Sequence, residues 1–232
     1  MRTRIQQIRP IAIIALCVCT CFGIPGASMR ASAADSVAPI GPGAAWQPGM
    51  QAIRTMREAC TEEPPGRFGD CLISEMSKAG APPAAVAFTR RVQKQMGQIV
   101  YATNFRKAGK VDIVHVEYLL RANENQGWLL VNGTPAIIDV DDIQRLSTEI
   151  LKGDRAYAAL AQRYPHVMLF PDDRSSRDEP RVEALSDGGE RFVVRYRLQD
   201  GCHACARVGS ASFAFDFDQA GRFIGTRLLS VD

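Results

Sequence analysis

The sequence predicts an α+β protein, and three patterns support this fold class. Between residues 50 and 97, apolar side chains recur every three or four positions, as they do in helices that bury one face. From residue 182 to the end, apolar and polar side chains alternate, which is typical of half-buried strands. Short apolar runs separated by turn residues lie between these regions. The expected order is an N-terminal helical hairpin, mixed strands with a central helix pair, and a C-terminal antiparallel β-meander.

The helical region follows an irregular N-terminal arm at residues 35–49, which is rich in proline and glycine. The first helix has an apolar stripe at Met50, Ile53, Met56 and Cys60. Residues 61–67, with two consecutive prolines, interrupt it. The second helix has an apolar side made of Phe68, Cys71, Leu72 and Met76. Gly80 and the pair Pro82-Pro83 end it and begin a third helix at about 83–97.

Two hairpins and a helix pair are expected next. Residues 107–110 and the dipeptide Asn132-Gly133 are turn signals, flanked by the apolar runs 99–105, 111–120, 128–131 and 136–140. Asp141 and Asp142 are placed to cap one short helix, with an apolar stripe at Ile143, Leu146 and Ile150. Gly153 ends this helix and Asp154 is placed to cap a second.

These elements, with a short strand at 167–170, make up an expected α+β domain at residues 50–170. A charged loop or linker at 171–181 leads to the β-meander at 182–232, which we expect to pack on the same domain. The apolar face of the meander is predicted from two alternating series: Phe192, Val194, Tyr196 and Leu198, and then Phe213, Phe215 and Phe217.

Residues 1–34 have the three parts of a cleaved secretory signal peptide. Arg2, Arg4 and Arg9 precede an apolar run from Pro10 to Ile24, and small residues follow, ending in Ala31-Ser32-Ala33-Ala34. The apolar run is shorter than the ~20 residues that a membrane-spanning helix needs. The sequence therefore predicts export to the periplasm or the medium, with cleavage between residues 28 and 34 and no membrane span in the mature chain.

The charge of the mature chain argues against nucleic-acid binding. The full chain has 28 Lys and Arg and 25 Asp and Glu, a formal net charge of +3. Four of the arginines and none of the acids precede residue 35, which leaves 24 basic and 25 acidic side chains. A near-neutral surface lacks the clustered cations that displace counterions from a phosphate backbone.

Four of the seven cysteines follow the signal region, namely Cys60, Cys71, Cys202 and Cys205. An even number in an exported chain indicates disulfides, and four cysteines allow three pairings. The pairings Cys60–Cys71 and Cys202–Cys205 are favoured because neighbours in sequence meet most easily. The first would join the end of one helix to the start of the next.

The motif Cys202-His203-Ala204-Cys205 is the strongest candidate for specific chemistry. A Cys-x-x-Cys motif with an internal histidine occurs in thiol–disulfide oxidoreductases, where it opens a helix. Here it follows Asp200-Gly201 at a turn between two predicted strands. The sequence therefore favours a structural hairpin disulfide. Redox exchange or metal handling through Cys202, His203 and Cys205 is the alternative, although a structural zinc site would need two more ligands.

Three other candidates have simpler structural interpretations. The segment 216–221 begins like a calcium loop but lacks the later ligands, so we expect a turn. Asp139, Asp141 and Asp142 are explained by helix capping. His115 lies two residues before Glu117 on the same strand face, where a base held by a carboxylate is conceivable, but no nucleophile motif accompanies it.

No cofactor motif is present in the sequence, and no catalytic residue is assigned. The favoured function is therefore an exported, disulfide-stabilised protein that binds another protein or a small molecule without catalysing a reaction. The alternative is a thiol–disulfide redox or metal-handling protein that uses the motif at residues 202–205. A closed hairpin disulfide without a cleft would favour the first function, and a thiol of strongly perturbed pKa beside an open groove would favour the second.

Overall fold

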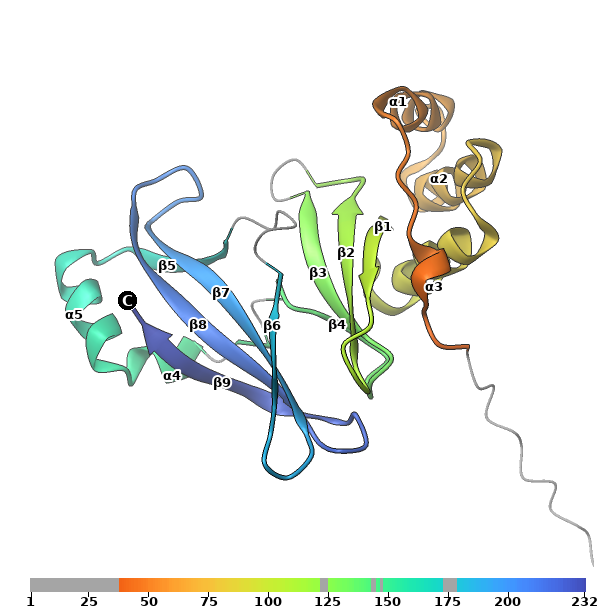
Figure 1. The fold of residues 1–232 in the computed structure, drawn as a ribbon. Coiled ribbons are helices and arrows are strands. Elements are labelled where there is room, and N and C mark those ends of the chain that lie inside the picture. The colour runs from red at the N-terminus through yellow and green to blue at the C-terminus, as the bar shows by residue number, and fades with distance from the viewer. Residues whose placement is uncertain (1–37, 122–124, 143–144, 147, 173–178) are drawn as a thin grey trace, which may run out of the picture. The chain divides into compact units, whose positions relative to one another are not determined.

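The computed structural model in Figure 1 describes residues 38–121, 125–142, 145–146, 148–172 and 179–232. The fold is α+β, as predicted: N-terminal helices precede a four-stranded antiparallel sheet, and the chain ends in a second, five-stranded antiparallel sheet. The predicted signal peptide, the start of the arm at 35–37, Ile143 and most of the charged loop, at 173–178, lie outside the described residues.

Three helices open the described chain: α1 (Met50–Ala59), α2 (Pro65–Lys78) and α3 (Pro83–Met96). Helix α2 begins earlier than the stripe predicts because Pro65 occupies its first turn, where the fixed φ of proline suits a helix. Cys60 caps the end of α1 as expected, but Cys71 lies inside α2 rather than at its start. Gly97 ends α3 with a φ of 67°, a conformation that glycine adopts without strain.

The first sheet contains β1 (Val100–Arg106), β2 (Asp112–Tyr118), β3 (Gln126–Val131) and β4 (Ile137–Asp139) in that order. Both of its faces are covered. One face, which includes Val114, Val116 and Leu129, packs against α3 and the N-terminal arm. The opposite face, which includes Ile113 and Trp128, packs against the second sheet. This explains why most residues of β2 and β3 are apolar; the polar exceptions are Asp112, His115 and Glu117 in β2 and Gln126 in β3.

From Ala38 onward, the arm packs against the first sheet. A short 3-10 helix, η1 (Pro42–Ala44), packs on α3, and the backbone N–H of Trp46 donates to the carbonyl of Ala102 at 2.7 Å. The arm therefore adds a stretch of chain to the outer edge of β1.

The central helix pair is shorter than the sequence predicts. Helix α4 is Thr148–Lys152, and residues 143, 144 and 147 before it lie outside the described residues. The N–H of Arg145 donates to the carbonyl of Asp142 at 2.9 Å, and the carboxylate of Asp139 accepts the N–H of Asp141 at 2.9 Å in a local turn. Helix α5 (Arg155–Arg163) begins as predicted. The carboxylate of Asp154 accepts the N–H groups of Ala156 and Tyr157 at 2.9 and 3.0 Å.

The second sheet contains β5 (Val167–Pro171), β6 (Arg181–Ala184), β7 (Glu190–Asp200), β8 (Arg207–Phe217) and β9 (Phe223–Val231). Its order is β5-β7-β8-β9, and β6 also pairs with β7. The meander β7-β8-β9 is the one predicted, and its two aromatic series are buried as expected. They form one core with Ile113, Trp128 and Leu130 of the first sheet.

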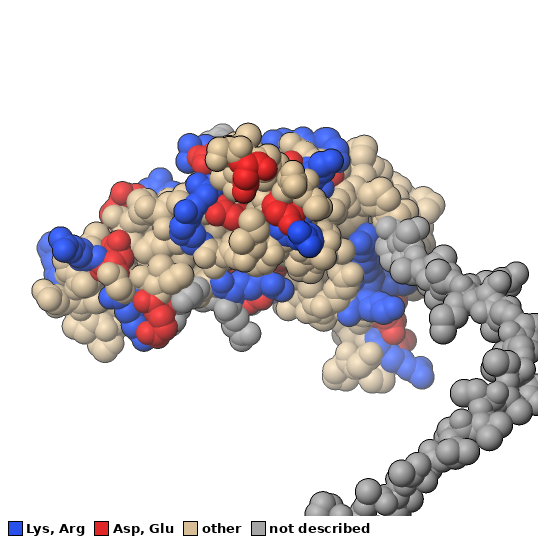
Figure 2. Space-filling model, turned by 90° about the horizontal axis from the view of Figure 1, so that it is seen from below, with Lys and Arg blue, Asp and Glu red and all other residues tan. Residues whose placement is uncertain are grey.

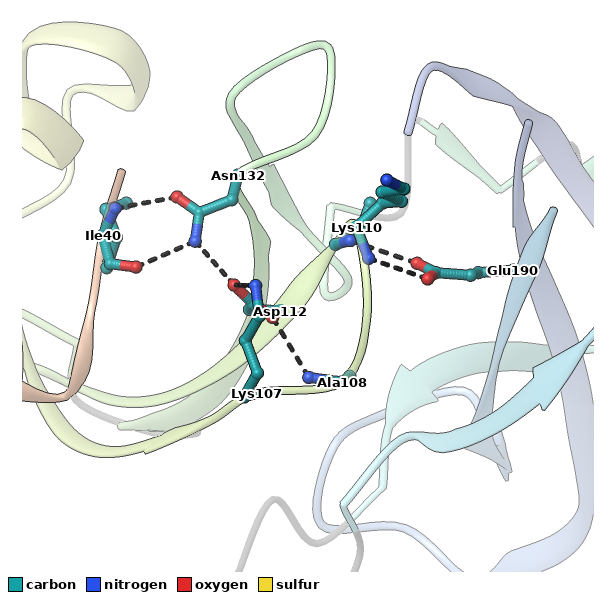
Figure 3. Close-up of polar contacts among 8 residues, drawn as sticks. Ile40, Lys107, Ala108, Lys110, Asp112, Asn132 and Glu190 are labelled. Atoms are coloured by element: carbon teal, nitrogen blue, oxygen red, sulfur yellow. Dashed lines mark hydrogen bonds and ion pairs between the residues drawn. The ribbon is translucent and has the colours of Figure 1, made fainter. Parts of the chain in front are cut away.

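Polar contacts also join the two sheets. The carboxylate of Glu190 on β7 accepts the backbone N–H groups of Lys110 and Val111 at 2.7 and 3.1 Å, and Figure 3 shows it reaching the turn before β2. The buried hydroxyl of Tyr196 donates to the carbonyl of Val140 at 2.5 Å. The segment 182–232 thus packs directly on the first sheet.

Asn132 connects three parts of the fold (Figure 3). Its side-chain oxygen accepts the N–H of Ile40, and its amide nitrogen donates to the carbonyl of Ile40, both at 2.8 Å. The same nitrogen donates to the buried carboxylate of Asp112 at 2.7 Å. Asp112 also accepts the N–H of Ala108 and the ammonium of Lys107 at 3.0 Å. Asn132 has a φ of 69°, a left-handed conformation that asparagine tolerates better than most residues.

Charged side chains of both signs are interspersed on the face shown in Figure 2 rather than gathered by sign. The outer side of the second sheet illustrates this, since Arg191 donates to Asp216 at 2.7 and 3.0 Å. Across the described ranges, no helix has the length and apolar character needed to cross a bilayer.

Candidate functional site

Both expected disulfides are present, and they lie in different surroundings. Cys60 is fully buried beside Ile53, Met56 and Leu72 in the core of the three helices, and its Cα lies 5.8 Å from that of Cys71. Cys202 is exposed and Cys205 is half-buried, in the loop between β7 and β8. In the chain-entropy model, the first disulfide contributes about 3 kcal/mol and the second, with its shorter loop, about 2 kcal/mol.

The loop at Cys202–Cys205 is held in place by bonds other than its disulfide. The buried amide of Gln199 donates to the carbonyls of His203 and Cys205 at 2.9 and 3.1 Å. The N–H of Cys205 donates to the carbonyl of Cys202 at 3.1 Å. Gly201 has a φ of 87°, which lets the chain turn out of β7.

An open pocket of about 610 Å³ adjoins this disulfide. It is lined by Cys202 and Cys205 together with Pro165, His166, Val167, Met168, Asp200 and Gly201. No pattern in the sequence predicts that His166 lies beside this disulfide. The pairing of Val167 with Asp200 in the β5–β7 ladder brings His166 beside the loop. A predicted strand at 167–170 does not by itself say which other strand it pairs with. The disulfide joins the two ends of the turn between β7 and β8, where the sequence predicts it, and an open pocket adjoins it.

The His203 ring contacts side chains of β7 and β5. One guanidinium nitrogen of Arg197 is 2.7 Å from its Nε2, and its ring meets that of Phe170 edge-on at 5.8 Å. The Arg197 side chain thus brings a permanent positive charge to the motif.

A second pocket, of about 550 Å³, lies between the arm and the first sheet. It is lined by Gln47 and Pro48 of the arm, Tyr101, Thr103 and Asn104 of β1, and His115 and Glu117 of β2. The hydroxyl of Tyr101 donates to the carboxylate of Glu117, and Oγ1 of Thr103 lies 2.5 Å from Nδ1 of His115. Burial, followed by the interaction with Glu117, raises the pKa of Tyr101 well above its usual value, so its hydroxyl keeps its proton.

Two features of this pocket could not be foreseen from the sequence. The β1–β2 register shifts between Ala102 and Asn104, and this β-bulge brings Thr103 to His115. The arm also supplies a wall, although its composition predicts only an irregular chain. His115 and Glu117 do share a face, as predicted, but Glu117 bonds to Tyr101, and the His115 ring packs 4.5 Å from that of Trp128.

The carboxylates of Asp139, Asp141 and Asp142 border a third pocket, of about 460 Å³, together with Arg121 and Arg145. Asp139 is buried and accepts the hydroxyl of Tyr118 at 2.9 Å and a guanidinium N–H of Arg121 at 3.4 Å. Burial raises the pKa of Asp139 above its ordinary value. These internal bonds account for Asp139 without requiring a ligand.

The segment that resembles the start of a calcium loop is a turn, as expected. The carboxylate of Asp218 accepts the N–H groups of Ala220 and Arg222 at 2.9 Å, while Asp216 pairs with Arg191 and Arg227. Among the residues whose positions are described, no three His, Cys, Asp or Glu side chains converge on a possible metal position.

Comparisons with protein-family models, curated proteins and solved structures found no match to this chain. The fold and the disulfides still define a class: the chain is an α+β protein with two disulfides. Disulfides are typical of proteins that fold in an oxidising compartment.

Proposed function

We propose that the protein is an exported binding protein, which takes up a small polar molecule in the pocket between the arm and the first sheet. The pocket itself carries this proposal. A cavity of about 550 Å³ is within the size range of small-molecule sites, and it has a few convergent polar groups. Its most buried polar side chains, Tyr101 and His115, are only 2 % and 6 % exposed.

The chemistry of the pocket selects a ligand that donates hydrogen bonds. The Glu117 carboxylate accepts hydrogen bonds and disfavours anions, while the amides of Gln47 and Asn104 serve as donors or acceptors. Tyr101 and Thr103 hold Glu117 and His115 in fixed positions before any ligand arrives. The ligand class is therefore a small neutral or cationic molecule with hydroxyl or amino groups, and the binding is non-catalytic.

Binding is tested with glucose, glycerol and putrescine as probes, by following the NMR resonances of Tyr101 and His115. A probe that binds should lose at least about tenfold in affinity with Glu117→Gln, because a hydrogen bond to a charged group contributes about 1.5–3 kcal/mol. Glu62→Gln, at an exposed position, is the matched control and should leave affinity unchanged. If no probe shifts either resonance, the pocket is not a site for this class of ligand.

Export is part of the same proposal, since residues 1–34 have the pattern of a signal peptide and the two disulfides suit an oxidising compartment. N-terminal sequencing of the protein recovered from the periplasm or the medium should begin between Met29 and Asp35. A recovered protein that still carries Arg2, Arg4 and Arg9 would contradict processing. The mature chain would then be a single domain, with segment 182–232 packed on segment 50–170.

A further inference from the structure

We infer that Cys202–Cys205 is an exchangeable disulfide that oxidises cysteine thiols of other polypeptides, a second activity independent of the polar pocket. Exposure is the first reason. Cys202 is exposed and lines an open pocket, so a thiolate can reach its sulfur. In the other disulfide, Cys60 is fully buried and Cys71 is partly buried against the helical core, so its sulfurs are less accessible. Accessibility is one of the factors that set the rate of thiol–disulfide exchange.

The loop is also built to keep its shape when the disulfide opens. Both hydrogen bonds from Gln199, and the bond between the backbones of Cys205 and Cys202, persist without the sulfur–sulfur bond. The N–H of Asp200 donates to the carbonyl of Ala206 at 3.1 Å and closes the base of the loop. The reduced cysteines would therefore remain close together, ready to be oxidised again.

The charge at the motif favours the reduced, anionic form of a cysteine. Arg197 lies against His203, which stands between the two cysteines in the sequence. Cationic groups near a thiol lower its pKa, and a stabler thiolate is a better leaving group.

The reaction follows from the difference in exposure between the two sulfurs. A substrate thiolate attacks Sγ of Cys202, a new sulfur–sulfur bond forms, and the Cys202–Cys205 bond breaks with Cys205 leaving as a thiolate. A second substrate thiolate then attacks the substrate sulfur and releases Cys202. Two substrate thiols become a disulfide, and the protein disulfide takes up their two electrons and two protons to become a dithiol. A disulfide such as oxidised glutathione reverses the change in the protein.

The pocket indicates which thiols are preferred. The pocket is largely apolar beside the sulfurs, because Pro165, Val167 and Met168 line it. Met168 is 51 % exposed and lies on β5, an edge strand of the second sheet. A polypeptide whose cysteine follows an apolar residue can place that residue against Met168 while its thiol reaches Cys202. Substrates are therefore cysteines with an apolar neighbour.

The test uses the mature chain and its own second disulfide as the control. Reduced glutathione should open Cys202–Cys205 at least about 100-fold faster than Cys60–Cys71, as followed by maleimide trapping and peptide mapping. Equal rates for the two disulfides would overturn the inference. Persistence of Cys60–Cys71 shows that the chain stayed folded during the reaction.

Two variants test the roles of the sulfurs and of the pocket. Oxidised glutathione should form a mixed disulfide with Cys205→Ala, through Cys202, at least about tenfold faster than with Cys202→Ala. N-acetyl-Phe-Cys-amide should open the wild-type disulfide several-fold faster than N-acetyl-Ser-Cys-amide, and Met168→Gln should abolish this preference. Faster capture by Cys205 would overturn the assigned roles, and equal rates for the two peptides would overturn the substrate class.

Discussion

Replacing Asn132 with alanine should lower the free energy of unfolding by about 3–5 kcal/mol, which is the largest loss we expect from a polar substitution in this protein. The substitution removes two hydrogen bonds to Ile40 and one to the buried carboxylate of Asp112. It also loses the tolerance of asparagine for the left-handed conformation, because alanine adopts a φ of 69° less readily. Urea unfolding at neutral pH measures the change.

Asn132→Gly separates the two contributions. Glycine loses the same three hydrogen bonds but adopts the left-handed conformation freely, so it should be about 1 kcal/mol more stable than the alanine variant. The glycine variant should also release the arm from the first sheet, which limited proteolysis near Ile40 would detect. A loss below about 1 kcal/mol for Asn132→Ala would mean that this network does not hold the arm.

Removing the helical disulfide with the double substitution Cys60→Ala and Cys71→Ala should lower the free energy of unfolding by about 3 kcal/mol. The disulfide closes a loop between residues that are 11 apart in sequence, and Cys60 is fully buried in the helical core. Urea unfolding of the oxidised proteins compares the variant with the wild type.

The matched control is the double substitution Cys202→Ala and Cys205→Ala, in a loop whose cysteines are only 3 apart and which Gln199 holds independently. It should cost about 2 kcal/mol or less in the chain-entropy model. A larger loss for this pair than for Cys60 and Cys71 would contradict the assignment of a mainly structural role to the helical disulfide.

The fold class could be predicted from sequence because its signals are local. The alternation of Phe192, Val194 and Tyr196 follows directly from one face of a strand being buried. The first residue of a helix was harder to predict where the sequence signals allowed two starting points. Pro65 begins α2 ahead of its apolar stripe, because its fixed φ suits the first turn of a helix.

The candidate sites depend on contacts between distant segments, which a single sequence does not encode visibly. His166 lines the same pocket as Cys202 only because of the register between β5 and β7. Gln47 lines the same pocket as Glu117 only because the arm runs beside β1. The β-bulge at Thr103 leaves no recognisable residue pattern. What the sequence did identify was the pair of His115 and Glu117, by their shared strand face, and the Cys202–Cys205 motif.

The covering of both faces of the first sheet also determines how this protein can change over evolutionary time. Ile113 and Leu130 face one core while Val114 and Leu129 face the other, so neighbouring positions along β2 and β3 are all constrained by packing. Strand β9, with Ile224 63 % exposed, has far more freedom. Selection should therefore preserve the volumes of residues in β2 and β3 while β9 drifts, and distant relatives would be recognised by that central strand pair before any other part of the chain.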